Sequence, residues 1–362
     1  MELKNLSDRV TRLRAAMKAA GIDGFLIPRN DEHFGEWVPA SAERLAWLTG
    51  FNGSAGMAIV LAERAAIFVD GRYTLAVRDQ VDLDAFETRH VTEEPASAWL
   101  AEVMQPGQRL GFDPWLHTAA GLEAIGKAVK TAGAELVAVD DNPVDAIWDD
   151  RPAAPMAPVV PHDMAYAGES AEAKRRRIAE LVAARDADAA VLTLPESIAW
   201  LLNIRGGDVP RTPLPLGFAV LHVDARVDLY MDPEKIGPDT RDHLGNAVAI
   251  APKAAFAEGL GSLSGKRVII DRPSAVQAVT DRLTAAGADV VAGEDPTMLP
   301  KACKNPVEVQ GSRSAHVRDG AAVSRLLAWR DRTARAGSAA ATRAAARGAA
   351  DGGRTRVRRP RS

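Results

Sequence analysis

The feature that most constrains the fold of this 362-residue sequence is an internal repeat. Two copies follow each other at an offset of roughly 155–165 residues. In each copy an Arg/Ala-rich segment precedes a short apolar run and a Trp-containing segment, and Trp47 corresponds to Trp200. The expected order in each copy is helix, strand, short helix, β-hairpin, helix, strand, helix, strand. The sequence therefore predicts an α/β fold with two similar domains, each built on a mixed sheet.

The first expected helix shows how local signals support this order. Its apolar residues fall at steps of four, three and four, which places them on one helical face. Ser7 is positioned to cap the start of this helix, and Gly21 to end it. The apolar residues of this face are Leu6, Val10, Leu13 and Met17.

Composition and charge exclude several classes of protein. Residues 332–362 contain nine Arg and one Asp, which leaves −11 on residues 1–331 when the whole chain carries −3. An acidic body argues against nucleic acid as a partner. Cys303 is the only cysteine, so an internal disulfide and a thiolate metal site are excluded. No apolar run is long enough to span a membrane, and the charged amphipathic N-terminus is not a signal peptide, so we expect a cytoplasmic protein.

Domain boundaries follow from changes in composition. The Pro/Ala-rich stretch 150–166 lacks periodicity and is the best linker between the copies. Asn305, Pro306 and Glu308 have the spacing of a helix-capping box. Residues 332–362 contain too little apolar surface to build a core, so we expect a disordered tail. The predicted segments are a first domain at 1–155, a second domain at 165–297, a connector with one helix at 302–331, and the basic tail at 332–362.

Several motifs resemble the aminopeptidase P (Xaa-Pro aminopeptidase) family, in its long form with two creatinase-like N-terminal domains. GFNGSAG and VDGRY resemble the first of these domains, and IAWLLNIRGGDVPRTPLP resembles the second. The stretch LPKACKNPVEVQGSRSAHVRDGAAVSRLLAW resembles the connector and first helix of the catalytic pita-bread domain. The resemblance covers about residues 1–331.

The resemblance implies release of an N-terminal residue from a peptide with Pro in second position. In the family, two divalent metal ions, commonly manganese, are held by two Asp, one His and two Glu of the catalytic domain. These ligands would follow residue 331, where this chain has one carboxylate and no His. We therefore expect no catalytic residue, no metal ligand and no cofactor in this chain, with the pita-bread domain truncated and the chain inactive.

The resemblance also implies a peptide partner and a homodimer. A non-catalytic oligomerisation or peptide-binding module is the alternative function. A contact with nucleic acid through the basic tail is a third hypothesis, which the acidic body disfavours.

Two residues are candidates for flanking the substrate. In the family, the loop that contains Trp37 faces the mouth of the active site, although the usual Ser-Glu-Tyr is replaced here by Gly35-Glu36-Trp37. Arg72 follows Asp70 and could reach a substrate or simply pair with that carboxylate. His33 lies near three acidic residues, so a metal cluster is conceivable, but a surface loop is the preferred interpretation. The acidic neighbours of His33 are Asp31, Glu32 and Glu36.

Overall fold

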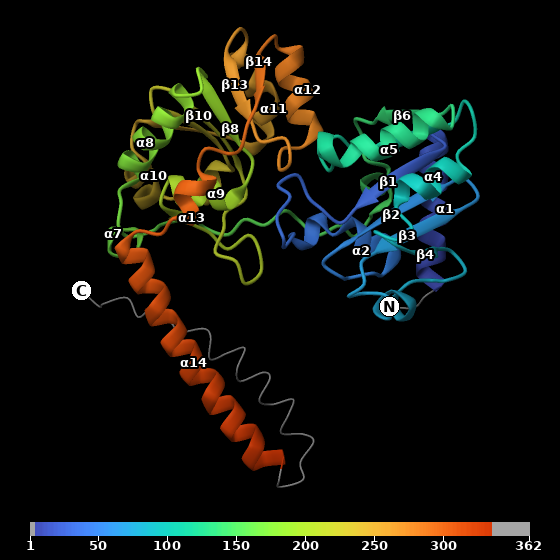
Figure 1. The fold of residues 1–362 in the computed structure, drawn as a ribbon, viewed down its shortest axis with the longest axis horizontal. Helices are drawn as coiled ribbons and strands as arrows, with labels where there is room; N and C mark the ends of the chain where they lie inside the picture. Colours follow the sequence, from blue (N-terminus) through green and yellow to red (C-terminus); the bar gives the residue numbers. More distant parts are fainter. Residues whose placement is uncertain (1–3, 335–362) are drawn as a thin grey trace. The chain divides into compact units, whose positions relative to one another are not determined.

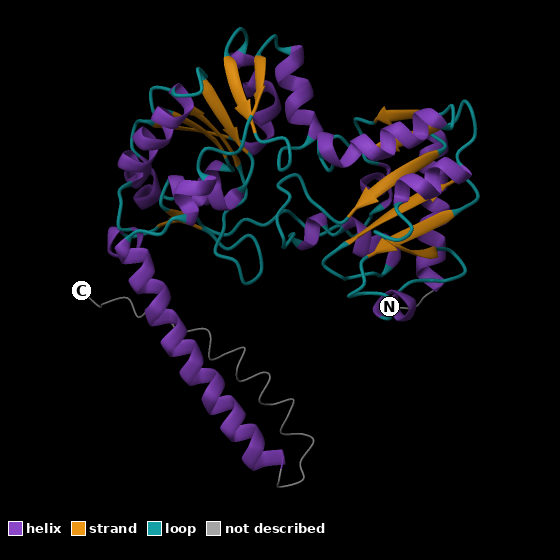
Figure 2. Cartoon of the chain, viewed as in Figure 1, coloured by secondary structure: helices purple, strands orange, loops and turns teal. Residues whose placement is uncertain are grey.

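The computed structural model describes residues 4–334 of the chain, and these residues divide into two compact units. The larger unit comprises the residues up to 162 together with 169–302, and contains both copies of the repeat. The smaller unit comprises 163–168 and the residues from 303 onward. Figure 2 shows that the larger unit contains both helices and strands, as expected for an α/β protein.

The first domain contains a six-stranded mixed sheet within the described residues, with strand order β4-β3-β2-β1-β5-β6 (Figure 1). Strand β2 is antiparallel to β1 and β3, whereas the remaining pairs are parallel. Its elements are α1 (Lys4–Ala19), β1 (Gly24–Pro28), η1 (Ala40–Ala42), α2 (Arg44–Thr49), β2 (Gly56–Leu61), β3 (Ala65–Val69), α3 (Ala76–Gln80), β4 (Glu87–His90), α4 (Ala96–Val103), β5 (Arg109–Phe112), α5 (Ala119–Thr131), β6 (Glu135–Ala138) and α6 (Pro143–Ile147).

The second domain has the same topology, with strand order β12-β11-β10-β8-β13-β14. Its elements are α8 (Ala171–Ala183), β8 (Ala189–Leu192), α9 (Pro195–Leu201), β10 (Phe218–His222), β11 (Val227–Tyr230), η2 (Pro233–Lys235), α10 (Pro238–Leu244), β12 (Val248–Ala251), η3 (Lys253–Ala255), α11 (Phe256–Gly259), η4 (Leu260–Leu263), β13 (Arg267–Ile270), α12 (Gln277–Ala285), β14 (Asp289–Ala292) and α13 (Met298–Ala302).

The predicted repeat is confirmed, because corresponding strands occupy corresponding places in the two sheets. The predicted element order was incomplete, since it lacked the edge strands β4 and β12. Strand β4 has the sequence Glu-Thr-Arg-His, which contains no apolar residue and gives no hydrophobic alternation. Its pairing with β3 exists only in the folded sheet.

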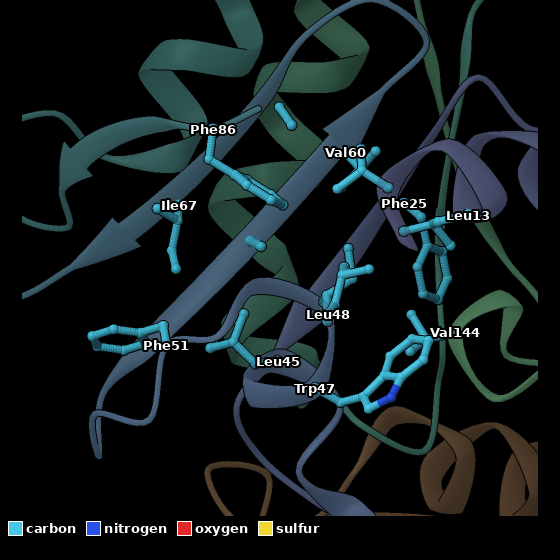
Figure 3. Close-up of a cluster of buried hydrophobic side chains, with 14 of the residues drawn as sticks. Leu13, Phe25, Leu45, Trp47, Leu48, Phe51, Val60, Ile67, Phe86 and Val144 are labelled. Atoms are coloured by element: carbon cyan, nitrogen blue, oxygen red, sulfur yellow. The ribbon is translucent and has the colours of Figure 1, made fainter. Parts of the chain in front are cut away.

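Both faces of each sheet are covered, because successive side chains along a strand point to opposite faces. In β1, Phe25 and Ile27 pack in one cluster with Trp47 and Leu48 of α2 (Figure 3). Leu26 lies in a second cluster with side chains of α4 and α5. The fully buried β1 therefore reads as a continuous apolar run rather than an alternating one.

The repeated Trp residues have the same surroundings in the two domains. The Arg9 guanidinium of α1 lies 4.4 Å from the centre of the Trp47 ring and donates a hydrogen bond to the Trp47 carbonyl. The Lys174 ammonium of α8 lies 4.4 Å from the centre of the Trp200 ring and donates to the Trp200 carbonyl over 3.1 Å. In each domain, a buried cation on the first helix thus fixes the short helix that follows the first strand.

The prediction that Ser7 caps the first helix is wrong. Helix α1 already begins at Lys4, and the Ser7 hydroxyl donates to Asp82 over 3.1 Å. Gly21 has a φ of 67° just after the helix, a conformation that glycine adopts at little cost.

The expected linker contains short elements of its own. Strand β7 (Val160–Pro161) pairs with β9 (Ile204–Arg205) of the second domain. Helix α7 (Met164–Ala167) follows and belongs to the smaller unit.

The remainder of the smaller unit that the structure describes is dominated by helix α14 (Pro306–Ala334). The predicted capping box is confirmed: Asn305 accepts hydrogen bonds from the backbone N–H groups of Val307 and Glu308, and Glu308 accepts one from the Asn305 N–H. The helix continues to Ala334, so the expected tail boundary at 332 falls inside it. The rest of the expected tail, 335–362, lies outside the described residues.

No helix in the described range 4–334 is long and apolar enough to cross a membrane.

The matched cores predict matched losses of stability. Leu48 and its counterpart Leu201 are fully buried, so replacing either with Ala should lower the free energy of unfolding by about 2–5 kcal/mol. Leu83 is 53% exposed, so Leu83→Ala should change this free energy by no more than about 0.5 kcal/mol. Urea titration followed by tryptophan fluorescence measures the effect, and equal effects of all three substitutions would contradict the assigned cores.

Candidate functional site

The loop Asp31–Trp37 follows β1 and is held in place by hydrogen bonds within the loop. The Asp31 carboxylate accepts a hydrogen bond from the His33 N–H over 3.0 Å, and the Asp31 carbonyl accepts one from the Phe34 N–H. Phe34 has a φ of 55°, a left-handed conformation that a bulky residue rarely adopts. The tight turn directs successive side chains of this loop toward different surroundings.

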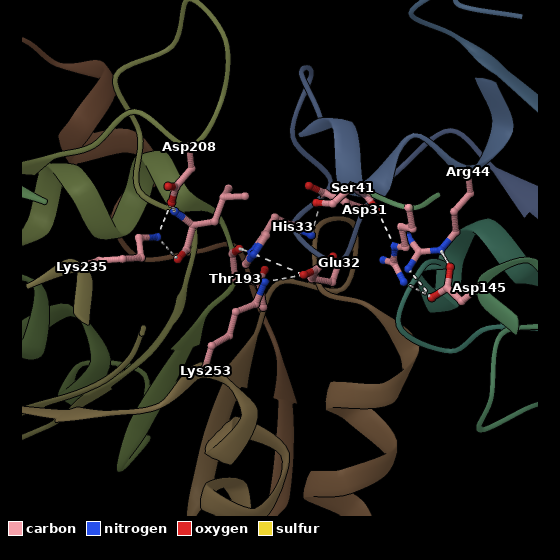
Figure 4. A network of polar contacts seen from close by, with 12 residues as sticks. Asp31, Glu32, His33, Ser41, Arg44, Asp145, Thr193, Asp208, Lys235 and Lys253 are labelled. Atoms are coloured by element: carbon pink, nitrogen blue, oxygen red, sulfur yellow. Dashed lines mark hydrogen bonds and ion pairs between the residues drawn. The ribbon is translucent and has the colours of Figure 1, made fainter. Parts of the chain in front are cut away.

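His33 lies against the second domain and not on the surface (Figure 4). Its ring is 0% exposed and lies 4.5 Å from the Phe218 ring, measured between centroids. Its Nδ1 donates a hydrogen bond to the Thr193 carbonyl over 3.2 Å, because a carbonyl oxygen can only accept. The preferred interpretation of a surface loop is therefore wrong for Asp31 and His33, although Glu36 and Trp37 are exposed.

An ion pair stands beside this contact. The Lys253 ammonium of the second domain pairs with the Glu32 carboxylate of the first (Figure 4). The same ammonium lies 5.7 Å from the centre of the Phe218 ring. The buried histidine, the ion pair and the aromatic ring thus form one interdomain contact.

A second strip of contacts joins the two domains through backbone groups. The Gln277 N–H donates to the His117 carbonyl over 2.7 Å, and the Ala278 N–H donates to the Pro114 carbonyl over 2.9 Å. Thr118 and Val276, the residues that cap the equivalent helices α5 and α12, form an antiparallel bridge. The repeat therefore contacts itself through corresponding segments, as in an isologous interface.

Burial displaces the pKa values of the loop in opposite directions. Burial, with a smaller contribution from Lys253, lowers the pKa of His33 to about 3, so this ring is neutral at pH 7. Burial and the neighbouring Glu32 carboxylate raise the pKa of Asp31 to about 6. Burial also acts to raise the pKa of Glu32, but several opposing interactions, led by the Lys253 ammonium, together hold this pKa well below its usual range.

The loop does not fit a metal centre. His33 Nδ1 is directed to a carbonyl, Asp31 accepts from a backbone N–H, and Glu32 is paired with Lys253. Within residues 4–334, no group of three or more His, Cys, Asp or Glu side chains is arranged to hold a metal ion. The two metal ions of the family have no matching ligand set in this part of the chain.

Trp37 lines a cavity of about 310 Å³ together with residues of both domains. Its side chain is 46% exposed, next to the exposed Glu36. The second domain contributes apolar side chains, one acidic side chain and one hydroxyl to the same cavity. These are Pro195, Glu196, Val209, Thr212, Leu214 and Leu216.

Arg72 lies in the exposed turn that follows β3. Its Nη2 donates to the Asp70 carboxylate over 2.7 Å, and its guanidinium lies 5.2 Å from the centre of the Tyr73 ring. The hydrogen bond to Asp70 is the main cause that raises the Arg72 pKa, and the Glu36 carboxylate contributes weakly. No hydrogen bond, ion pair or ring contact joins Arg72 to Trp37 in the described part of the chain.

Sequence reasoning missed the second-domain half of this site. Thr193, Phe218 and Lys253 contact the loop, but they carry no motif and lie 160 to 221 residues away from their partners. Only the correspondence between the repeat copies could have pointed to Thr193. This residue directly follows the first strand of the second copy, as the loop of His33 follows the first strand of the first copy.

The opposed pKa shifts predict a pH dependence of stability. Between about pH 6 and 4 the native state binds a proton at Asp31 that the unfolded chain does not, which raises stability as the pH falls. Below about pH 6.5 the unfolded chain protonates His33 while the native state does not, which lowers stability. In the native chain the two effects oppose each other.

The Asp31→Asn substitution keeps a side-chain oxygen that can accept the hydrogen bond from the His33 N–H. It removes the Asp31 carboxyl group and therefore its titration. Between about pH 6.5 and 4.5 this variant should lose up to about 2 kcal/mol more unfolding free energy than the unmodified chain. Urea titrations across this range measure the difference, with Asp239→Asn as an exposed control. Parallel pH profiles of the variant and the unmodified chain would contradict the burial of Asp31 as a titrating group.

Two sequence families match the chain. Residues 9–147 match the family described as the creatinase/prolidase N-terminal domain, and residues 150–308 match a second family of the same description. The two matches coincide with the two sheets described above.

Two fungal relatives of this chain are both described as probable Xaa-Pro aminopeptidase P. A probable Xaa-Pro aminopeptidase P of Aspergillus niger is 34% identical over 340 residues, which cover 91% of this chain and 55% of the relative. A probable Xaa-Pro aminopeptidase P of Paracoccidioides brasiliensis is 33% identical over 344 residues, with 91% and 56% covered. The chain thus spans about half the length of the curated relatives it matches.

A solved structure agrees with these relatives. The crystal structure of X-prolyl aminopeptidase from Caenorhabditis elegans, described as a cytosolic enzyme with a di-nuclear active site, matches with a TM-score of 0.85 and 26% identity. The match covers 92% of this chain and 57% of that structure. By both sequence and fold, the chain belongs to the creatinase/prolidase N-terminal domain family, with two such domains in tandem, and is similar over most of its length to Xaa-Pro aminopeptidases.

Proposed function

We propose that this chain supplies the substrate-flanking domains of a Xaa-Pro aminopeptidase and does not itself hydrolyse peptides. The observation that carries the proposal is the loop Asp31–Trp37. Its buried half is pinned to the second domain through His33, while Glu36 and Trp37 remain exposed beside a cavity of about 310 Å³. A rigid base with an exposed aromatic tip is suited to contact a peptide without reacting with it.

The proposed lack of hydrolysis is based on the side chains present. Hydrolysis at a two-metal centre needs several convergent carboxylate and imidazole ligands, and the described residues 4–334 offer no such group. Residues 335–362 add one carboxylate, Asp351, and no His. This chain's own residues are proposed only to flank and orient the peptide.

We assign the substrate-flanking role to Trp37 and Arg72. Trp37 provides an exposed ring at the cavity, and Asp70 fixes the orientation of the exposed Arg72 guanidinium. The substrate class is a peptide with Pro in second position. These assignments extend to this chain the activity named for its relatives.

A homodimer is the proposed assembly, and the cytoplasm the proposed location. Helix α14 exposes Val317, Val323 and Leu327, which are 74%, 54% and 54% exposed. Apolar side chains of this kind favour association. Sedimentation velocity should therefore show a species of twice the chain mass, and a monomer at micromolar concentrations would contradict the dimer.

A non-catalytic peptide-binding module is the second candidate, favoured by the cavity beside Trp37. It predicts saturable binding of an X-Pro-X peptide by the chain alone, weakened by Trp37→Ala. Leu83→Ala, a substitution at an exposed apolar position far from this cavity in the sequence, is the matched control.

The main proposal predicts no peptidase activity. The purified chain, incubated with an X-Pro-X peptide and excess Mn²⁺, should release the N-terminal residue no faster than buffer. Chromatographic detection of the free amino acid measures this rate. A Glu36→Gln, Glu196→Gln variant purified in parallel controls for contaminating host peptidase. Turnover that a chelator abolishes and that is present only in the unmodified chain would overturn the proposal.

A further inference from the structure

The contact at His33 joins two domains that each have hydrophobic clusters of their own. Two buried clusters consist of residues of the first domain, and two others consist of residues of the second domain and the adjoining linker. Phe34 and Trp115 of the first domain pack against one of the second domain's clusters. The Pro/Ala-rich stretch 150–166 connects the two domains along the chain. The domains can therefore separate without disrupting either sheet.

The buried His33 ring is suited to this contact only in its neutral form. The ring is 0% exposed, and its Nδ1 already donates to the Thr193 carbonyl of the second domain. Its Nε2 is buried and has no hydrogen-bond partner among residues 4–334. The nearest Glu32 oxygen lies 3.9 Å away, too far for a hydrogen bond. A proton added to Nε2 would create a buried charged donor without an acceptor, which is costly.

The charges around the ring also act on a proton there (Figure 4). Lys253 and Lys235 of the second domain disfavour a positive charge on His33, whereas Glu32 favours it. Lys253 is paired with Glu32, and the buried Lys235 is paired with Asp208. The second domain thus places two ammonium groups near the ring. The other carboxylates that line the same cavity as His33 are Asp31, Glu36 and Glu196.

Separation of the domains would return His33 to water. Burial, with a smaller contribution from Lys253, lowers the pKa of the ring to about 3 in the closed contact. An exposed imidazole has a pKa of about 6.5. As the pH falls below about 6.5, the separated form therefore binds a proton that the closed form does not, and this difference favours separation.

The two carboxylates of the same loop act in different pH ranges. Asp31 is 1% exposed, and burial together with Glu32 raises its pKa to about 6. Its protonation between about pH 6 and 4 favours the closed form and opposes the effect of His33. The pKa of Glu32 is held well below its usual range in the closed contact, so below about pH 4 this group favours separation as well.

We infer that the contact of His33, Glu32 and Lys253 is an acid-sensitive latch between the domains. Below about pH 4 the two domains separate while each keeps its own fold, and Asp31 keeps the latch closed at higher pH. Separation also dismantles the cavity beside Trp37, because both domains contribute its walls. The inference does not depend on the proposed function.

Energy transfer between fluorophores on the two domains tests the inference on the full chain. Cys303 is exposed and is replaced by Ser, and labels are attached to Ala101→Cys of α4 and Ala183→Cys of α8, both at exposed positions. Excess unlabelled chain suppresses transfer between copies. The transfer efficiency should stay constant from about pH 7.5 to 4.5 and change below about pH 4. A pair within the second domain, Ala183→Cys and Ala285→Cys, should give a constant signal, and the far-ultraviolet circular dichroism should be retained.

Two substitutions assign the transition to this loop. His33→Asn keeps an N–H that can donate to the Thr193 carbonyl but does not titrate, so the midpoint should fall by at least about one pH unit or the transition should disappear. Asp31→Asn removes the opposing titration, so the midpoint should rise by at least about one pH unit. Asp239→Asn, at an exposed position of the second domain, is the matched control and should leave the midpoint unchanged.

Two results would overturn the inference. One is an interdomain signal that stays constant until the circular dichroism is lost, and the other is an equal midpoint in His33→Asn and the unmodified chain. If His33→Asn is unfolded or already separated at about pH 7.5, Asp31→Asn decides the question, and an unchanged midpoint in that variant overturns the inference. Because neither peptide nor metal is present, these outcomes are distinct from failure of the peptidase proposal.

Discussion

The arrangement of the larger unit depends on one buried, uncharged histidine. His33 is fully buried between the domains, and its Nδ1 is committed to the Thr193 carbonyl. Burial disfavours the protonated imidazole, although the Glu32 carboxylate, 3.9 Å from His33 Nε2, acts in the opposite direction. Because the ring stays neutral, it packs on Phe218, and the adjacent Glu32 reaches Lys253. The same loop exposes Trp37, which lines the cavity of about 310 Å³ together with His33.

Duplication explains why the contact exists at this place. The two domains share a strand order, and each anchors its Trp with a cation from its first helix. They meet through corresponding segments, such as Thr118 and Val276 at the starts of equivalent helices. The copies have diverged where they touch. In the first copy the turn Asp31–Phe34 follows the first strand, whereas the second copy has no such turn at the equivalent place, between Thr193 and Pro195. Function is therefore proposed in the diverged loops, while the duplicated strands and helices provide the scaffold.

The relatives extend well beyond the region that matches this chain. Matches over 91% of the chain establish its descent, whereas the relatives are nearly twice as long as the matched region. The activity of the relatives is therefore only proposed for this chain.

The sequence by itself determined the repeat, the α/β class, the helix capped by Asn305 and the resemblance to a family, because these depend on local patterns and motif order. It did not determine the edge strand β4, whose polar residues pair only once β3 is in place. It also placed His33 on the surface, since no local pattern shows that Thr193 and Phe218, 160 and more residues away, will cover it. Burial of charged and polar residues between domains is decided by tertiary contacts, and these contacts set the pKa values and the cavities.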